Sequence, residues 1–240
     1  IVADSDAWVS WNVTTQTPIT VAEKMAAEPE WSNVAQVKSR AYYPVGTFGV
    51  DIHDGSDLSL ADFLYYYIIT HERGLAGSMI DDPAYASAYN AFVSTFKGVK
   101  YLTDVPGYDL VVEYWTTAWN LDAEYCINHQ FPTYSQGPGM WHTLALAILG
   151  EDAGQCAFSQ SKAQDPIVWT NFIGEGQDIL EGHLDTVKVL TEITNDDIPY
   201  YDFISGEYTS RSLGDFEAEV IERYDNLDAW HTAHDHFWVA

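Results

Sequence analysis

Basic residues are scarce in this chain. Ten lysines and arginines stand against 36 aspartates and glutamates, which gives a formal net charge of −26 over 240 residues. A surface of that sign repels the phosphates of nucleic acids and of anionic membranes, so neither is an expected partner. The acidic residues are spread along the sequence rather than gathered in blocks. This distribution favours an ordinary solvated surface, and adaptation to high salt is the alternative interpretation.

We predict that added salt distinguishes these two interpretations. Counterions screen the repulsion between like charges, and the Debye length falls from about 30 Å at 0.01 M salt to about 3 Å at 1 M. In a chain adapted to high salt, the melting temperature should therefore climb as NaCl is raised from low to molar concentration. A series of circular-dichroism melting curves measures this. A flat response would assign the charge to ordinary solvation.

Long apolar runs are also missing. No segment approaches the ~20 consecutive apolar residues that a membrane-spanning helix needs. The first residues, Ile1–Asp4, lack the charged and apolar regions of a signal peptide. We expect the chain to begin and end inside a longer protein.

Cysteine is limited to Cys126 and Cys156. In an oxidising compartment these two side chains could form one disulfide, worth about 3 kcal/mol when the loop-closure entropy of the unfolded chain is counted. Two buried free thiols that behave as small apolar side chains are the alternative. The sequence does not give the separation of the two Cα atoms, so both alternatives stay open.

The sequence contains few of the motifs that mark known classes of enzyme. The chain has no Gly-x-Ser-x-Gly element and no phosphate-binding loop that ends in Gly-Lys-Ser or Gly-Lys-Thr, and neither Gly137–Gly139 nor Gly174–Gly176 replaces one. The acidic residues are too many to single out a catalytic pair. We therefore expect no catalytic residue, and we keep a secreted hydrolase acting on a carbohydrate or a peptide as the alternative.

Three histidines near the end of the chain, His231, His234 and His236, have spacings that occur in metal sites. A helix places His231 and His234 on one face, but it does not place His236 there. No other cluster of metal ligands stands out in the sequence. We interpret the three histidines as a helix end, and we expect no metal and no cofactor.

Aromatic residues are abundant, with nine Trp and 16 Tyr, which excludes a disordered chain in spite of its charge. The spacing of apolar residues predicts a mixed α/β fold in a single domain of 240 residues, strand-rich over residues 1–115 and helical over residues 116–240. Expected strands cover residues 8–13, 37–43 and both halves of a hairpin over residues 98–114. Expected helices cover residues 83–96, 144–149, 179–193, 216–224 and 227–234. The first of these helices is expected to begin at Pro83 and to bury Ala84, Ala88, Ala91, Phe92 and Phe96.

The run from His53 to Phe63 is the most informative in the chain. Alternating apolar residues predict a strand over residues 48–53, and the Asp-Gly pair that follows predicts a tight turn. Ser59 is the expected N-cap of a helix, and the carboxylate of Asp62 is placed to complete a capping box. Gly74 is the expected end of that helix.

This run reads His-Asp-Gly-Ser-Asp-Leu-Ser-Leu-Ala-Asp-Phe. Its sequence resembles a segment of the extracellular solute-binding proteins of family 5. These proteins are the peptide- and nickel-type receptors of ABC importers. Three further features follow in the order of that family: the hairpin over residues 98–114, the loop Gly137–His142 and the terminal run His236–Val239. The resemblance covers roughly residues 35–240.

The resemblance implies a periplasmic-binding-protein type II-like fold, of which this chain would hold part of the first lobe, with residues 116–240 as a helical insert. The family's Gly-Thr-Gly-Pro turn is not reached before Ala240. The implied function is non-catalytic binding of a small-molecule or peptide solute, above all an oligopeptide, outside the cell or in the periplasm. The implied partner is an ABC permease in the membrane, and a lipid anchor on the parent protein is left open.

The segment from Trp115 to Trp141 is dense in aromatic residues. It is either a cluster of core and loop aromatics or a recognition surface, because aromatic bodies with polar tips suit varied ligands. The resemblance places this segment at the border of the ligand cleft. It implies that five residues line the cleft: Tyr89, Asn128, His129, Gln130 and Tyr134.

Overall fold

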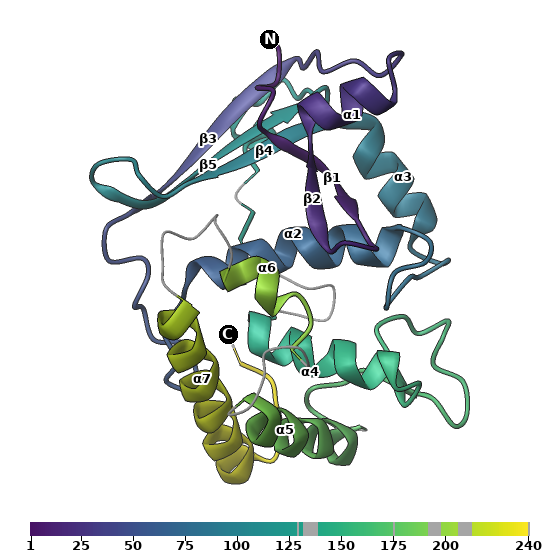
Figure 1. Cartoon of the computed structure of the whole chain (residues 1–240), viewed down its shortest axis with the longest axis vertical. Coiled ribbons are helices and arrows are strands. Elements are labelled where there is room, and N and C mark those ends of the chain that lie inside the picture. Colours follow the sequence, from purple (N-terminus) through teal and green to yellow (C-terminus); the bar gives the residue numbers. More distant parts are fainter. Residues whose placement is uncertain (129, 132–138, 175, 192–197, 206–212, 240) are drawn as a thin grey trace.

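An antiparallel sheet lies over a layer of helices in the computed structural model of the chain (Figure 1). The structure describes residues 1–128, 130–131, 139–174, 176–191, 198–205 and 213–239. The elements up to the end of the sheet are β1 (Trp8–Asn12), β2 (Thr17–Thr20), α1 (Val21–Ala27), β3 (Val37–Pro44), α2 (Leu60–Gly74), α3 (Ala86–Thr95), β4 (Phe96–Leu102) and β5 (Tyr108–Thr116). The elements that follow are η1 (Ala123–Cys126), α4 (Trp141–Asp152), β6 (Cys156–Ala157), β7 (Val168–Trp169), α5 (Gln177–Thr191), α6 (Tyr201–Ser205) and α7 (Leu213–His234).

The sheet has the strand order β2-β1-β4-β5-β3, and all neighbouring strands are antiparallel. β4 and β5 form the hairpin predicted over residues 98–114, and β1 and β3 coincide with the strands predicted over residues 8–13 and 37–43. All five strands of this sheet precede residue 117, and α4 to α7 follow it. The predicted mixed α/β class, with strands concentrated in the first half and helices in the second, is therefore confirmed.

The predicted turn and helix cap before α2 are both present. Gly55 has a φ of +87°, a left-handed conformation that side chains other than glycine rarely adopt. The Ser59 side chain caps the first turn of α2, and the Ser59 amide donates to Oδ2 of Asp62 at 2.9 Å. The helix runs to Gly74, as predicted.

The strand predicted over residues 48–53 is wrong. In the described part of the chain, the only β-bridge of this segment is an isolated one, between Asp51 and Asp57. Its backbone bonds mainly to its own loop, where the amide of Leu58 donates to the carbonyl of Val50 at 2.9 Å, and the Phe48 amide donates to Asp109 Oδ2 at 2.9 Å. Ile52 is buried and Phe48 packs against the core, but Val50 between them is half exposed, so the alternating residues do not share one buried face.

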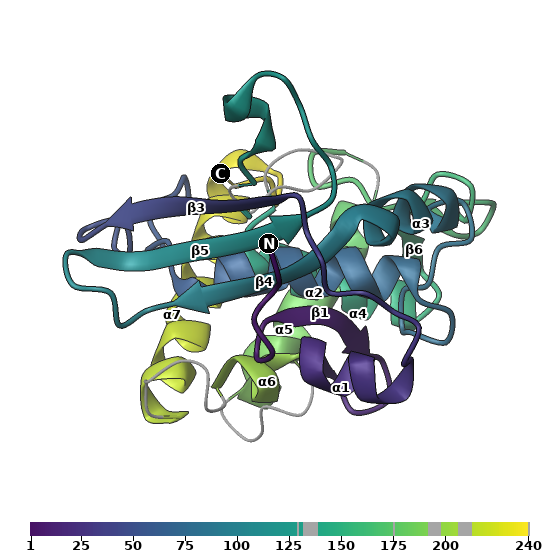
Figure 2. The same cartoon turned by 90° about the horizontal axis from the view of Figure 1, so that it is seen from above.

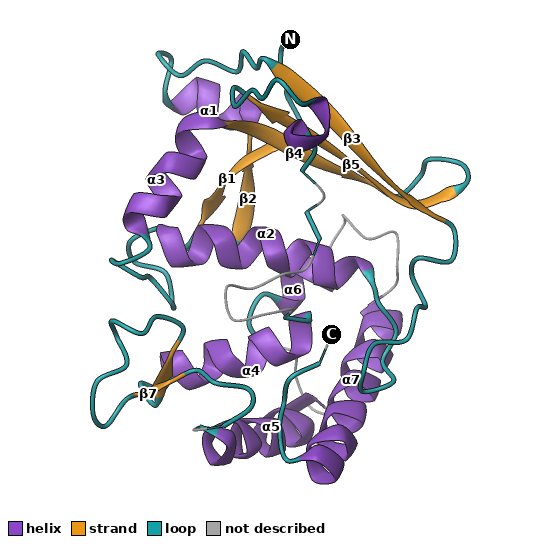
Figure 3. Cartoon of the chain, turned by 180° about the vertical axis from the view of Figure 1, so that it is seen from behind, coloured by secondary structure: helices purple, strands orange, loops and turns teal. Residues whose placement is uncertain are grey.

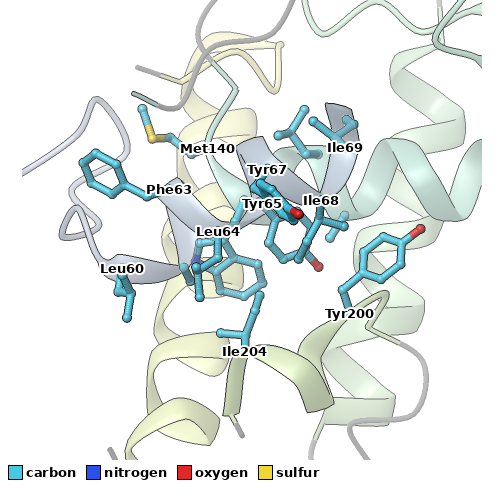
Figure 4. Close-up of a cluster of buried hydrophobic side chains, with 14 of the residues drawn as sticks. Leu60, Phe63, Leu64, Tyr65, Tyr67, Ile68, Ile69, Met140, Tyr200 and Ile204 are labelled. Atoms are coloured by element: carbon cyan, nitrogen blue, oxygen red, sulfur yellow. The ribbon is translucent and has the colours of Figure 1, made fainter. Parts of the chain in front are cut away.

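α2 lies between the sheet and the lower helices (Figures 1 and 3). Eleven of its 15 residues are buried, which is more than one helical face can hold, so α2 is packed on opposite sides. From the sheet, the ring of Trp8 lies 5.6 Å from the ring of Tyr67. Figure 4 shows Ile204 of α6 and the neighbouring Tyr200 next to the α2 side chains. The Tyr200 ring centroid lies 6.1 Å from that of Tyr65.

The lower layer consists of α4, α5 and α7, which contact one another (Figure 3). Two helices were expected over residues 216–224 and 227–234, but α7 is continuous through both. The residues at the expected break are held by α5, because Lys188 Nζ lies 3.1 Å from Asp225 and 2.7 Å from Asp228. None of the helices in the described part of the chain is long and apolar enough to cross a membrane.

The helix predicted over residues 83–96 begins later and buries another face. Asp82 forms a turn in which its carboxylate accepts from the amide of Ala84, and the helix starts at Ala86. The alanines expected inside, at positions 84, 88 and 91, are exposed. The buried residue of α3 is Tyr89, because an aromatic side chain removes more apolar surface from water than alanine does. Phe92 is half-buried, and Phe96 is buried as predicted but as the first residue of β4.

α4 buries the apolar run predicted over residues 144–149, but it passes through Gly150 and ends at Asp152. Gly150 packs against Cys156, and a Cβ atom at position 150 would lie 2.5 Å from the Cys156 sulfur. The glycine therefore permits close packing and does not end the helix. α5 covers the helix predicted over residues 179–193 as far as residue 191.

Candidate functional site

The structure describes three of the five residues that the sequence analysis places at a ligand cleft. Asn128 and Gln130 follow η1 in the segment after β5, and Tyr89 lies in α3. His129 and Tyr134 lie outside the described residues. Asn128 and Gln130 line one cavity, and Tyr89 contacts His71, which lines the same cavity. The fold therefore brings the three described residues together from segments far apart in the sequence.

This cavity, which we call the α2 cavity, has a volume of about 130 Å³. α2 contributes four of its lining side chains, at one-turn spacing on a single face: Tyr66, Tyr67, Thr70 and His71. The other side chains come from Tyr85, Phe92 of α3, Asn128 and Gln130. No aspartate, glutamate, lysine or arginine belongs to this lining among the described residues, although the chain carries 46 such residues (10 + 36).

His71 is the most deeply buried titratable group of the α2 cavity. Its side chain is fully buried, and Nδ1 lies 2.7 Å from the Tyr89 hydroxyl. Its other ring nitrogen, Nε2, has no hydrogen-bond partner among the described residues. Burial lowers the pKa of His71 to about 3, because the apolar surroundings penalise the charged imidazolium. The imidazole is therefore neutral at physiological pH.

Tyr89 lies behind His71 and fixes its position. The Tyr89 side chain is buried, and burial raises the pKa of its hydroxyl. Its ring packs directly on Gly74 at the end of α2, where a Cβ atom would lie 2.0 Å from the ring. Only glycine leaves room for this contact, so Gly74 is what allows the Tyr89 ring of α3 to pack against the end of α2.

Asn128 and Gln130 are held by hydrogen bonds to each other and to the sheet. The Gln130 backbone amide and Nε2 both donate to Asn128 Oδ1, at 3.0 Å and 2.7 Å. The hydroxyl of Tyr101, on β4, donates to Gln130 Oε1 at 3.0 Å. These bonds fix the orientation of both side-chain amides at the cavity.

A second hollow of about 240 Å³ lies against the segment between β5 and η1. Asn128 lines both hollows. The segment and η1 carry exposed apolar side chains, with Trp119 at 64 %, Leu121 at 89 % and, in η1, Tyr125 at 79 % exposure. Figure 2 shows the segment projecting beyond the sheet. Large apolar side chains gathered on one exposed segment are typical of a recognition surface.

The run from His53 to Phe63 builds a buried ionic network. Arg223 of α7 is buried, and its Nη1 and Nη2 donate to the two carboxylate oxygens of Asp62 at 3.1 and 2.7 Å. The same guanidinium donates to the backbone carbonyl of Asp57 and to the Ser59 hydroxyl. Such two-pronged pairing suits the planar guanidinium. These hydrogen bonds connect the loop before α2 to α7.

His142 of α4 extends this network to Asp54. Its Nδ1 lies 3.2 Å from Arg223 Nη1, and its Nε2 lies 2.8 Å from Asp54 Oδ2. A guanidinium can only donate, so Nδ1 accepts and Nε2 carries the proton that it donates to Asp54. Burial lowers the pKa of His142, with the bond to Asp54 acting in the opposite direction. The imidazole is neutral in this arrangement.

Arg223 was not among the site residues predicted from the sequence. Its signal was present, because Arg223 is the one basic residue between residues 217 and 228, where acidic residues dominate. Glu219 lies one turn earlier on α7, with a carboxylate oxygen 3.4 Å from the guanidinium. A groove of about 370 Å³ runs beside the network, between the loop before α2 and α7.

The three histidines near the end of the chain are occupied by aromatic contacts. His231 stacks on Phe237 with ring centroids 4.0 Å apart, and His234 stacks on Trp230 at 3.7 Å. His236 lies 6.0 Å from His234, measured between ring centroids. Among the described residues, no group of three or more His, Cys, Asp or Glu side chains is arranged to hold a metal ion.

Both cysteines are free thiols, so the disulfide alternative does not hold in this structure. Cys156 is buried, and its sulfur contacts the Ala147 carbonyl of α4. Cys126 lies in η1, where its sulfur contacts the carbonyl of Asn120. Cys126 is partly exposed, which differs from the expectation of two buried thiols.

The fold and the site define a mixed α/β protein with an uncharged, largely aromatic cavity next to an exposed apolar segment. The chain matches no model of a known protein family, and it matches no curated protein sequence. The function is therefore inferred from the site.

Proposed function

We propose that the chain is a solute-binding part of an extracellular receptor of an ABC importer, which binds an oligopeptide and does not convert it. The observation that carries this proposal is that Asn128 lines both the uncharged α2 cavity and the hollow beside the exposed apolar segment. Solute sites set fixed polar groups among aromatic and apolar side chains, and both hollows are lined by aromatic side chains beside the Asn128 amide. The resemblance of the run from His53 to Phe63 points to the same class of protein.

A peptide has the chemistry that this surface would recognise. Its backbone carries both donors and acceptors, and Asn128 and Gln130 present fixed side-chain amides that offer both. Its side chains vary, and exposed aromatic residues such as Trp119 and Tyr125 bind varied groups through large, adaptable contacts. The net charge of −26 would attract basic peptides and repel acidic ones.

The receptor would deliver its solute to a permease in the membrane. In receptors of this kind, lobes close on the ligand about a hinge, which buries the ligand from both sides. The hollows described above would form one wall of such a cleft. The place of action is then outside the cell or in the periplasm.

Calorimetric titration with a library of short peptides tests the proposal. We expect Trp119→Ala and Asn128→Ala each to weaken peptide binding at least ten-fold, a loss of about 1.4 kcal/mol. Both side chains line the hollows, whereas Tyr42 is exposed on β3 and lines neither, so Tyr42→Ala is the matched control and should bind as the unmodified chain does. Neutral and basic peptides should bind more tightly than acidic ones.

Two outcomes would contradict the proposal. If no peptide in the library binds, or if both variants bind as tightly as the unmodified chain, the two hollows are not the peptide site. If mass spectrometry detects hydrolysis of any library peptide, the chain is catalytic and the hydrolase alternative takes the place of the receptor.

A further inference from the structure

The α2 cavity is a partly open hollow whose described lining carries no Asp, Glu, Lys or Arg side chain, in a strongly acidic protein. Its volume of about 130 Å³ is close to that of engineered apolar cavities of about 150 Å³ that admit one benzene molecule. The cavity is therefore of the right size for a single small ring. Since no Asp, Glu, Lys or Arg side chain lines it among the described residues, a charged group that entered would lose its hydration without gaining a partner.

The walls of the α2 cavity suit an aromatic ring. The ring of Tyr67 lies 4.5 Å from that of His71, and the ring of Phe92 lies 5.9 Å from it, at interplanar angles of 53° and 65°. Tilted and edge-to-face arrangements of this kind are preferred between aromatic rings. A planar ring that entered the cavity would find faces and edges on more than one side.

His71 is a lining residue of the α2 cavity, and its Nε2 atom is a buried hydrogen-bonding atom without a partner among the described residues. The His71 ring is fully buried. A buried nitrogen without a partner costs free energy, so such atoms are rare in folded proteins. Since Nδ1 already contacts the Tyr89 hydroxyl, Nε2 is the nitrogen left for a ligand.

The hydrogen-bonding chemistry of a neutral imidazole restricts which ligand groups can pair with Nε2 of His71. In one tautomer Nε2 donates a hydrogen bond, and in the other it accepts one. A hydroxyl group can both donate and accept, so it satisfies Nε2 in either tautomer. A plain hydrocarbon ring leaves Nε2 unpaired, and a carboxylate is excluded by its charge.

We propose that the α2 cavity is a subsite for a neutral aromatic ring that carries a hydroxyl group, which bonds to Nε2 of His71. The further step, that the ring is a tyrosine side chain of a bound peptide, rests on the proposed function. The subsite would then give the receptor a preference for tyrosine over phenylalanine at one position of its peptide. A site built to bond a hydroxyl discriminates against the analogue that lacks it, because the buried partner is left unpaired.

Phenol, benzene and benzoate are the probes that test the subsite on the unmodified chain. We expect phenol to bind saturably and to shift the ¹⁵N resonance of His71 Nε2, benzene to bind at least five-fold more weakly without that shift, and benzoate not to bind. The variant His71→Phe should lose the preference for phenol over benzene. The control is His183→Phe, because His183 lies on α5 outside the α2 cavity, and it should keep that preference.

The comparison of probes on the unmodified chain needs no variant, so it decides the question even if His71→Phe does not fold. Absence of saturable phenol binding, or equal binding of phenol and benzene with no change at His71, overturns the subsite. Titration with Gly-Tyr-Gly and Gly-Phe-Gly then separates the two proposals. Peptide binding without a preference for tyrosine overturns the subsite and leaves the receptor standing, whereas phenol binding at His71 without binding of any peptide supports the subsite and overturns the peptide receptor.

Discussion

Replacing Arg223 by methionine should lower the free energy of unfolding by about 3–5 kcal/mol. The guanidinium is buried and makes two hydrogen bonds to Asp62, and it donates to Nδ1 of His142 as well. Methionine fills much of the same volume but donates no hydrogen bond. The carboxylate of Asp62 would remain buried beside the helix cap with its main positive partner removed, and an uncompensated buried charge is expensive.

Urea-induced unfolding, followed by circular dichroism, measures this loss. The stability of Arg223→Lys should lie between that of the unmodified chain and that of Arg223→Met, because lysine keeps the charge but cannot make two parallel hydrogen bonds to the carboxylate. The matched control is Arg40→Met on β3, where Lys38 still pairs with Glu113, 3.0 Å away, after the substitution. Its cost should be within about 1 kcal/mol, because Arg40 is half exposed and the buried Glu113 keeps Lys38 as its partner. Equal stability of Arg223→Met and Arg40→Met would show that the buried network contributes nothing particular.

Replacing His71 by phenylalanine should flatten the dependence of stability on pH. The folded-state pKa of His71 is about 3, whereas an unfolded histidine titrates near 6.5. Between these values the unfolded chain binds a proton that the folded chain does not, so the free energy of unfolding falls as pH falls. The slope is about 1.4 kcal/mol per pH unit for one histidine, or about 2 kcal/mol between pH 6 and pH 4.5.

The stabilisation by neutral His71 is thus complete above pH 6.5 and is lost progressively below it. The difference between the unmodified chain and His71→Phe isolates this contribution, since the remaining titratable groups are shared. Tyr89→Phe is the control, because it removes the hydroxyl next to Nδ1 but leaves the imidazole buried, and it should keep the original slope. Parallel stability curves for the unmodified chain and His71→Phe would contradict the burial of a neutral imidazole.

Local sequence patterns predicted correctly those features of the fold that are determined by residues close together in the sequence. The capping box needs only Ser59 and Asp62 three residues apart, and the turn needs a glycine at position 55 for its positive φ. The hairpin of β4 and β5 needs two apolar runs joined by a short turn. Each of these features was predicted, because neighbours in the sequence decide it.

The same kind of pattern gave wrong predictions for features that depend on contacts between residues far apart in the sequence. The alternation over residues 48–53 is typical of a strand, but among the described residues it forms only an isolated bridge to Asp57, and Val50 is half exposed. The expected break near residue 225 in α7 does not occur, since Lys188 of α5 pairs with Asp225 and Asp228. Gly150 was expected to end α4, and its actual role is to admit the sulfur of Cys156.

The sequence alone determined the acidic surface, the mixed α/β class and the capped helix α2, and it selected Asn128 and Gln130 as members of a candidate site. Only the tertiary structure decided that His71 completes that site and that Arg223 joins α7 to the loop before α2. Charge and local conformation follow from composition and from residues a few positions apart. A cavity or a buried ion pair depends on which surfaces the packed helices and sheet bring together, over separations such as the 161 residues between Asp62 and Arg223.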